Sequence, residues 1–336
     1  MPNPSVEIPL SDRLRPSWRH FEVGGFVNEL GLAWDPVQDQ FRFSAPNFDE
    51  SNEITKRKAL SEFAKLFDPL GWLAPLVVVG KMLIQDLWKA KLSWDERIPA
   101  SMMSYWNMFR ENVKKVHQIN IPRYINYEPN SQIELHLFTD ASRRAMAAAV
   151  YSRTSSSHKQ MSTPLIAART KLSPIKSLNP SKRPVGRVTI PRLELRAALL
   201  GAKLLKAQAE VLCIELNHCT GWSDSQVVIR WLSSNQPVGN DLVDNYISHI
   251  QELLPDFKWR YVPTSENPAD VATRGSDVEN LSQHPLWSYG PPWLKKAKDA
   301  WPKESILQSK SAPISEISIP IQCHITQANP TILDRF

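Results

Sequence analysis

Four acidic residues lie where a predicted strand ends or a predicted helix begins: Asp140, Glu194, Asp224 and Asp270. The first two bound a stretch of 53 residues, 141–193, that contains eleven basic residues and no acidic one. The chain carries a net charge of +6, but without those eleven residues it would hold 29 basic against 34 acidic residues. Such a local excess is the electrostatic footprint of a polyanion-binding protein. A solvated basic loop is the alternative.

Four converging carboxylates repel one another unless divalent cations compensate their charge. A ligand set made only of oxygens suits Mg²⁺ or Mn²⁺ rather than zinc, which prefers Cys and His. Two such ions, about 3.5–4 Å apart, activate a water and stabilise the leaving oxygen of a phosphodiester. The pattern therefore predicts a nuclease site in which all four residues are catalytic and bind metal. Taken singly, each carboxylate could have a structural role. Asp270 could stabilise the N-terminus of a helix that has Asn267 as its N-cap and Pro268 as its first residue.

The strands that must position these carboxylates follow from alternating hydrophobicity. Residues 133–138 alternate and deliver Asp140 at the end of a half-buried strand. Residues 145–151 and 165–170 complete an antiparallel meander, and two later strands are expected at 219–222 and 257–262. Residues 173–186, which contain three prolines, read as a flexible basic loop. The stretch from Lys176 to Arg192 should border the acidic site.

Helices alternate with the later strands. Thr189-Ile190-Pro191 starts one helix, with Glu194 in its first turn, and further helices are expected at 227–232, at 242–254 and after Asn267. A meander mixed with crossover helices predicts an α/β fold in which a mixed five-stranded sheet is flanked by helices.

The ends of the chain have a different pattern. One or two strands are plausible in residues 1–50. A helix from Thr55 carries apolar residues at Leu60, Phe63, Ala64 and Phe67, and two more helices at 76–88 and 99–117 complete a small helical unit. Residues after about 276 have no sustained period and look like an extension or linker.

The composition indicates an intracellular protein, cytoplasmic or nuclear, that is not secreted. Its three cysteines share no metal-ligand spacing and fit a reducing compartment. The N-terminus lacks the features of a signal peptide, and the longest apolar run, residues 70–80, is shorter than the roughly 20 residues that span a bilayer. We therefore expect no membrane partner.

Four sequence strings resemble the active-site motifs of the RNase H domain in BEL/Pao-type retrotransposon polyproteins, in the same order and at similar spacing. They are Phe138-Thr139-Asp140-Ala141-Ser142, Pro191-Arg192-Leu193-Glu194-Leu195, Trp222-Ser223-Asp224-Ser225 and Asn267-Pro268-Ala269-Asp270. Residues 30–35 are similar to the end of the reverse transcriptase palm, and residues 56–71 and 85–88 to the thumb and connection region. Residues 290–294 resemble the stretch leading to the integrase.

This resemblance implies four regions: a palm-end remnant (1–50), a thumb/connection-like helical unit (51–125), an RNase H-like domain (130–275) and an extension or linker toward an integrase (276–336). It also implies hydrolysis of the RNA strand of RNA/DNA hybrids with two Mg²⁺ or Mn²⁺ ions. Expected partners are the hybrid and other parts of the polyprotein, such as the palm and the integrase.

The resemblance also suggests how a hybrid would be bound. Recognition would depend on 2′-hydroxyls in the minor groove, for which residues near Ser142, Ser225 and Gln226 are candidates. Basic residues of the acid-free stretch would hold phosphates without reading sequence. They are Arg169, Lys171, Lys182, Arg183, Arg187 and Arg192.

The sequence departs from related enzymes in two respects. Many RNase H enzymes place a histidine before the last aspartate, but none occurs between Trp259 and Asp270, and Tyr261 occupies the place where we would look for it. No Tyr-x-Asp-Asp string occurs, so we expect no reverse transcriptase activity from this chain.

Two other functions are compatible with parts of the sequence. The chain could be a retroelement remnant that binds nucleic acid without cutting it. An integrase-like site for DNA strand transfer would need a zinc-binding module, for which Cys323 and His324 are the only hint near the C-terminus.

Overall fold

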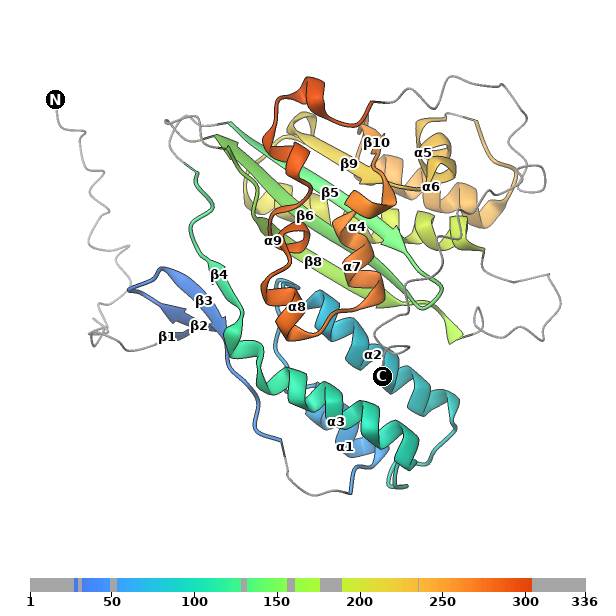
Figure 1. Ribbon diagram of the computed structural model, residues 1–336. Coiled ribbons are helices and arrows are strands. Elements are labelled where there is room, and N and C mark those ends of the chain that lie inside the picture. The colour runs from blue at the N-terminus through green and yellow to red at the C-terminus, as the bar shows by residue number, and fades with distance from the viewer. Residues whose placement is uncertain are drawn as a thin grey trace, which may run out of the picture.

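The computed structural model describes residues 27–29, 32–48, 53–127, 132–155, 161–175, 189–234 and 236–303. A large twisted sheet lies between two layers of helices, and a helical unit with a small sheet packs beside it (Figure 1). Within the described residues, no helix is long and apolar enough to cross a bilayer.

The large sheet is mixed, as predicted. Its strands are β5 (Ile133–Ala141), β6 (Ala145–Ser155), β7 (Met161–Ser162), β8 (Leu165–Leu172), β9 (Cys219–Ser223) and β10 (Trp259–Tyr261). The order is β10-β9-β5-β6-β7, with β8 also paired to β6. The meander β5-β6-β8 is antiparallel, whereas β9 lies parallel to both β5 and β10. The mixed sheet and its five predicted strands are thus confirmed, but the sheet has six strands because the two-residue β7 adds to it.

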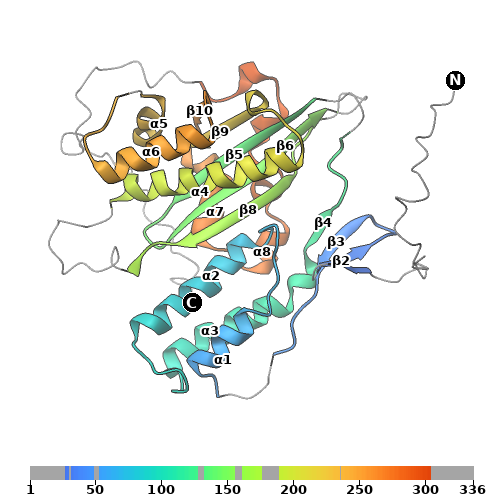
Figure 2. The ribbon, with the colours of Figure 1, turned by 180° about the vertical axis from the view of Figure 1, so that it is seen from behind.

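One face of this sheet is covered by α4 (Ile190–Val211), α5 (Gln226–Ser233) and α6 (Asp241–Leu253), which Figure 2 shows in front of the strands. Alternate strand residues such as Leu135 and Leu137 point to this layer and pack with α4. Gly201 of α4 lies so close to β5 that a Cβ atom would meet Thr139 Cγ2 at 2.6 Å. This close approach fixes the height of α4, and hence of Glu194, above the sheet.

The opposite face is covered by short helices from the end of the described chain. They are α7 (Pro268–Arg274), α8 (Val278–Ser282), α9 (Pro285–Tyr289) and the 3-10 helices η5 (Pro292–Lys295) and η6 (Lys298–Ala300). Trp287, Trp293 and Trp301 are buried in this layer. The expected extension after residue 276 is therefore packed along its described part. Isolated tryptophans on very short helices leave no periodic signal in the sequence.

The small sheet has four antiparallel strands in the order β1-β2-β3-β4. They are β1 (Val27–Glu29), β2 (Leu32–Asp35), β3 (Gln40–Phe43) and β4 (Asn120–Pro122). The sequence suggested one or two strands before residue 50. The fourth comes from beyond the helical unit and was missed because it has only three residues and ends in proline.

The helical unit consists of α1 (Lys56–Phe63), α2 (Ala74–Lys89), α3 (Ala100–Lys114) and the 3-10 helix η1 (Val116–Gln118). Thr55 caps α1, because its hydroxyl accepts the Lys58 N–H at 3.3 Å. The predicted apolar face of α1 was right for Phe63, which packs against Phe109, but wrong beyond it: the helix ends at Phe63, and Phe67 is exposed. Glu62 is buried instead, since Arg110 pairs with it at 3.0 Å and Trp106 Nε1 donates to it at 2.9 Å.

The helical unit is joined to the large sheet along the edge strand β8. Leu70 O accepts the Ala168 N–H at 2.7 Å, and Gly71 follows with φ at +77°. A Cβ atom at position 71 would lie 1.8 Å from Ala168 O, so only glycine fits. The two parts share one hydrophobic core, which includes Trp72, Phe138 and Trp287.

Candidate active site

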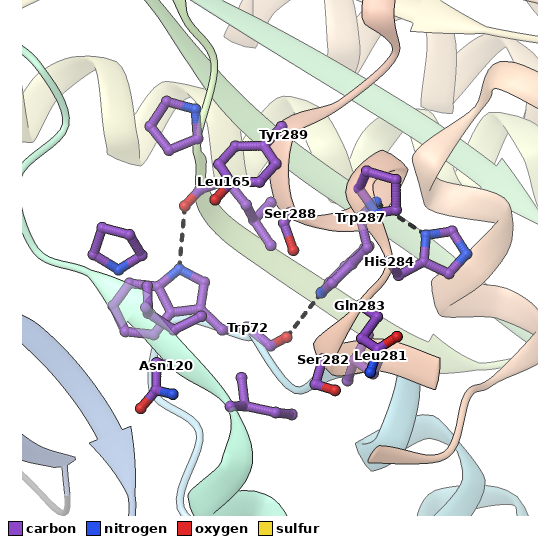
Figure 3. A pocket seen from close by; sticks show the side chains of 15 residues that line it. Trp72, Asn120, Leu165, Leu281, Ser282, Gln283, His284, Trp287, Ser288 and Tyr289 are labelled. Atoms are coloured by element: carbon purple, nitrogen blue, oxygen red, sulfur yellow. Dashed lines mark hydrogen bonds between the residues drawn. The ribbon is translucent and has the colours of Figure 1, made fainter. Parts of the chain in front are cut away.

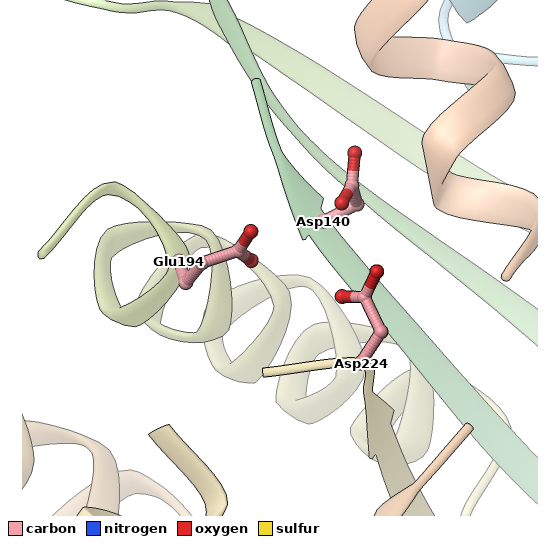
Figure 4. Close-up of side chains that lie close together, drawn as sticks. All are labelled: Asp140, Glu194 and Asp224. Atoms are coloured by element: carbon pink, nitrogen blue, oxygen red, sulfur yellow. The ribbon is translucent and has the colours of Figure 1, made fainter. Parts of the chain in front are cut away.

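Three of the four predicted carboxylates converge at the end of the central strands (Figure 4). Asp140 lies near the end of β5, and Asp224 directly follows β9, the parallel neighbour of β5. Parallel neighbours end at the same edge of a sheet, which brings these two residues together. Glu194 reaches them from α4; because that helix begins at Ile190, Glu194 lies just beyond the first turn in which we expected it.

The three carboxylates form a compact group. One oxygen from each of Asp140, Glu194 and Asp224 lies within 4.8 Å of the others. Asp140 is 5% exposed and Glu194 is 7% exposed. Two of the oxygens, Glu194 Oε2 and Asp224 Oδ1, are buried without a hydrogen-bond partner among the described residues. Buried acceptors that lack a donor are costly, so their surroundings fit a cation.

The electrostatics of the group point the same way. Burial, followed by the charges of Asp224 and Asp270, raises the pKa of Asp140 well above its ordinary value. Burial and then the charge of Asp140 do the same to the pKa of Glu194. Burial also raises the pKa of Asp224, although hydrogen bonds such as that from Thr264 oppose the shift. These shifts show that buried negative charge without a compensating cation is poorly tolerated at this place.

Several side chains hold these carboxylates in place. The Thr273 hydroxyl contacts Asp140 Oδ2, and the Thr264 hydroxyl donates to Asp224 Oδ2 at 2.7 Å. Asn267 is fully buried, and its Nδ2 donates to Thr139 O at 3.0 Å. These contacts tie the segment 264–273 to the ends of β5 and β9. Sequence reasoning missed the two threonines and the tethering role of Asn267.

Asp270 lies in the first turn of α7, as predicted, but outside the compact group. Its charge still raises the pKa of Asp140. Asn267 takes the N-cap position, since its Oδ1 accepts the Ala269 N–H at 3.1 Å. The Asp270 carboxylate instead receives Arg274 Nε, which lies 2.7 Å from Oδ1 and 2.8 Å from Oδ2. The spacing of four residues on one helix could have revealed this pair.

The candidates for hydrogen bonds to a hybrid lie close to the carboxylates. Ser142 sits in the turn after β5, where its hydroxyl accepts the N–H groups of Arg144 at 3.2 Å and Ala145 at 3.0 Å. Ser225 caps α5 by accepting the Val228 N–H at 3.4 Å, and Gln226 is the first residue of that helix. Both hydroxyls thus have structural bonds that the sequence did not predict.

The basic candidates are only partly described. Arg169 and Lys171 are exposed on the edge strand β8, and Arg192 lies half-buried in the first turn of α4. Lys182, Arg183 and Arg187 lie outside the described residues, as does most of the predicted basic loop. Tyr261 is the last residue of β10. Burial, and then the charge of Asp224, raise the pKa of the Tyr261 hydroxyl.

A cavity of about 260 Å³ lies elsewhere, between β4, the start of β8 and α9 (Figure 3). Trp72 Nε1 donates to Leu165 O at 3.3 Å, and Trp287 Nε1 donates to Trp72 O at 2.9 Å, in its wall. None of its lining residues is acidic. The cavity therefore lacks the carboxylates that make the acidic group a candidate Mg²⁺ site.

A family model described as the Pao retrotransposon-like RNaseH-like domain matches residues 55–225. The chain belongs to this family. The match begins at the N-cap of α1 and ends one residue after Asp224. The match to this family model thus includes the helical unit and the three carboxylates that converge. No curated protein sequence matches the chain.

Solved structures that resemble the chain include RNase H domains and a viral reverse transcriptase. The N-terminal RNase H domain of a Mycobacterium tuberculosis protein has 15% identity and a TM-score of 0.27, with 45% of this chain and 98% of that chain covered. LC11-RNase H1 in complex with an RNA/DNA hybrid has 14% identity and a TM-score of 0.26, with 41% and 91% covered. The foamy viral protease-reverse transcriptase in complex with double-stranded DNA has 12% identity and a TM-score of 0.22, with 71% and 45% covered. The family match, not these structures, identifies the domain.

Proposed function

We propose that this chain is a divalent-metal-dependent endoribonuclease that hydrolyses the RNA strand of RNA/DNA hybrids. One observation carries the proposal: Asp140, Glu194 and Asp224 place oxygens within 4.8 Å of one another, and two of their buried oxygens have no donor among the described residues. Membership of an RNase H-like family supports the choice of a nuclease over other metal-dependent reactions.

The donor set fits Mg²⁺ or Mn²⁺, because it consists of carboxylates and contains no Cys or His. Asp140, Glu194 and Asp224 would hold the metal, and Asp270 would complete the ligands for a second ion. When bound, two such ions activate a water and stabilise the leaving oxygen of the phosphodiester. The protein contributes fixed positions for the carboxylates, since Thr273 and Thr264 orient two of them.

The nucleic acid would approach from the exposed side of this group. Exposed Arg169 and Lys171 on β8, together with Arg192, Lys182, Arg183 and Arg187, would neutralise phosphates irrespective of sequence. Residues around Ser142, Ser225 and Gln226 are close enough in the chain to Asp140 and Asp224 to read 2′-hydroxyls beside the cut.

We also propose that the chain is one part of a retrotransposon polyprotein. Residues 1–50 would end a polymerase palm, residues 51–125 would form the thumb and connection, residues 130–275 the RNase H domain, and residues 276–336 would lead toward an integrase. The family match supports the retrotransposon origin. Polymerase and integrase segments would then be partners of this chain.

The test is cleavage of a labelled RNA/DNA hybrid by the purified chain, with RNA and DNA duplexes of the same sequence alongside. We expect cleavage of the hybrid alone, with Mg²⁺ and not with EDTA. Asp140→Asn and Asp224→Asn should each lower the rate on the order of 100-fold or more, since metal ligands contribute several kcal/mol. Asp95→Asn makes the same chemical change at an exposed ion pair with Arg57 and should retain full activity.

Two results would contradict the proposal. Folded Asp140→Asn protein that cuts at the normal rate would remove the acidic group from the reaction. Hybrid binding with Ca²⁺ and no cleavage with Mg²⁺ would instead favour a chain that binds nucleic acid without cutting it.

A further inference from the structure

The fourth carboxylate is separated from the other three by a positive charge within its own helix. Asp270 is not a member of the group whose oxygens lie within 4.8 Å. Arg274, one turn later on α7, directs Nε at both Asp270 oxygens, at 2.7 and 2.8 Å. The guanidinium therefore covers both atoms with which Asp270 could bind a cation.

We propose that Arg274 is a resident competitor of the second divalent ion, because it holds Asp270 until that ion displaces it. The inference rests on the proposed metal-dependent function. It assigns Asp140, Glu194 and Asp224 to a first ion, and it makes the binding of the second ion depend on breaking the ion pair between Arg274 and Asp270.

The backbone around the pair is fixed, so only the Arg274 side chain has to move. Ala269 and Ala272 of α7 are fully buried, and the helix ends at Gly275, where a Cβ atom would lie 2.5 Å from Val79. Ser276 N then donates to Pro75 O of α2 at 3.1 Å. The Arg274 side chain, in contrast, is 43% exposed and can turn toward solvent.

The exchange is electrostatically reasonable in both directions. Without metal, one guanidinium offsets part of the charge of three carboxylates, Asp270, Asp140 and Asp224. Burial lowers the pKa of Arg274. The hydrogen bond from Arg274 to Asp270 and the charges of Asp270, Asp140 and Asp224 outweigh this effect and raise the pKa. A divalent ion carries twice the charge, and a partly exposed ion pair is weak enough to be displaced. The ion's apparent affinity is reduced by the fraction of Asp270 that is occupied.

The test counts bound Mn²⁺ by electron paramagnetic resonance in the absence of nucleic acid. Wild-type protein should bind one ion more tightly than a second. Arg274→Met keeps the aliphatic stem and removes the charge, and should tighten the second ion on the order of fivefold relative to the first. Arg274→Met combined with Asp270→Asn should lose the second ion.

The matched control is Arg143→Met, which removes an exposed charge three residues after Asp140 without touching Asp270. It should leave the ratio of the two dissociation constants unchanged. An unchanged ratio in Arg274→Met, or an equal change in Arg143→Met, would overturn the competitor role while leaving the metal site intact. If wild type binds no Mn²⁺, the proposed function fails, and this inference fails with it.

Discussion

Thr273 is the residue that connects the last helix to the first carboxylate. It is 1% exposed, and its hydroxyl lies against Asp140 Oδ2 and 3.0 Å from Asp270 O. Its own carbonyl accepts the Ser142 hydroxyl at 3.4 Å. A donor in this position favours the ionised form of Asp140, since it opposes the effect of burial on the pKa. Thr273 should therefore keep Asp140 ready to bind a cation.

Replacing this hydroxyl should weaken the metal site. Thr273→Val has nearly the same shape but no donor, so Mn²⁺ affinity and hybrid cleavage should both fall about 10–100-fold. Thr273→Ser keeps the donor and should remain within a few-fold of wild type in both measurements. Equal values for the Val and Ser variants would show that the hydroxyl does not orient Asp140.

Asp68 fixes the loop that leads into α2. Its Oδ2 accepts the Leu73 N–H at 2.9 Å, while Oδ1 is buried without a hydrogen-bond partner among the described atoms. Burial raises the pKa of Asp68 to about 6, and backbone hydrogen bonds from Leu73, Trp72 and Gly71 only partly offset it. Compared with the unfolded chain, the folded protein therefore favours the protonated form of Asp68.

The raised pKa of Asp68 makes stability depend on pH. The unfolded chain loses the Asp68 proton near pH 4, whereas the folded protein holds it up to about pH 6. Proton binding by Asp68 therefore adds to the free energy of unfolding below pH 4, and this addition is lost as the pH rises through about 6. Asp68→Asn keeps an acceptor for Leu73 and should remove this loss. Its free energy of unfolding relative to wild type should rise by up to about 3 kcal/mol between pH 4 and pH 8. The free energies of unfolding would be measured by urea denaturation at each pH. If the two proteins changed in parallel between pH 4 and pH 8, the raised pKa would not belong to Asp68.

Elements with a regular period were predictable from the sequence. The alternation in residues 133–138 identified β5, and proline at the second residue of α4 marked its start. The buried face of α1 was not predictable, because Glu62 enters the core only through partners in α3, 44 and 48 residues away. Such partners become visible only in three dimensions.

The same distinction applies to the site. The order and setting of the four carboxylates suggested one metal site, and the structure brings three of them together. The separation of Asp270 depends on Arg274, and the orientation of Asp140 depends on Thr273. These contacts follow from side-chain directions on α7, which the identity of a residue does not specify.

At the scale of the whole molecule, residues 276–303 complete the core of the large sheet. The ring centroids of Trp293 and Trp222 lie 4.6 Å apart, and Arg153 Nε donates to Leu294 O at 2.9 Å. Lys298 pairs with Glu134 at 2.6 Å. The folded unit therefore extends well past the last predicted active-site residue.

Truncation should show where folding requires the chain to end. A chain ending at residue 275 would lose three buried tryptophans, each contributing about 1.5–3 kcal/mol, and should aggregate or melt at a much lower temperature. A chain ending at residue 303 keeps these three tryptophans and should melt at a clearly higher temperature than the shorter chain, as followed by circular dichroism. Identical melting of both shortened chains would mean that the C-terminal layer adds little.

The attachment of α2 to β8 also has a consequence for association between copies. An outer strand normally presents free peptide groups to which another chain can add. Here the carbonyls of Leu165, Thr170 and Ser173 accept hydrogen bonds from Trp72, Lys81 and Gln85, and Leu70 O takes the Ala168 N–H. The helical unit thereby protects the edge strand β8 against β-pairing with another molecule. Copies of the domain at high local concentration should therefore not polymerise through β8.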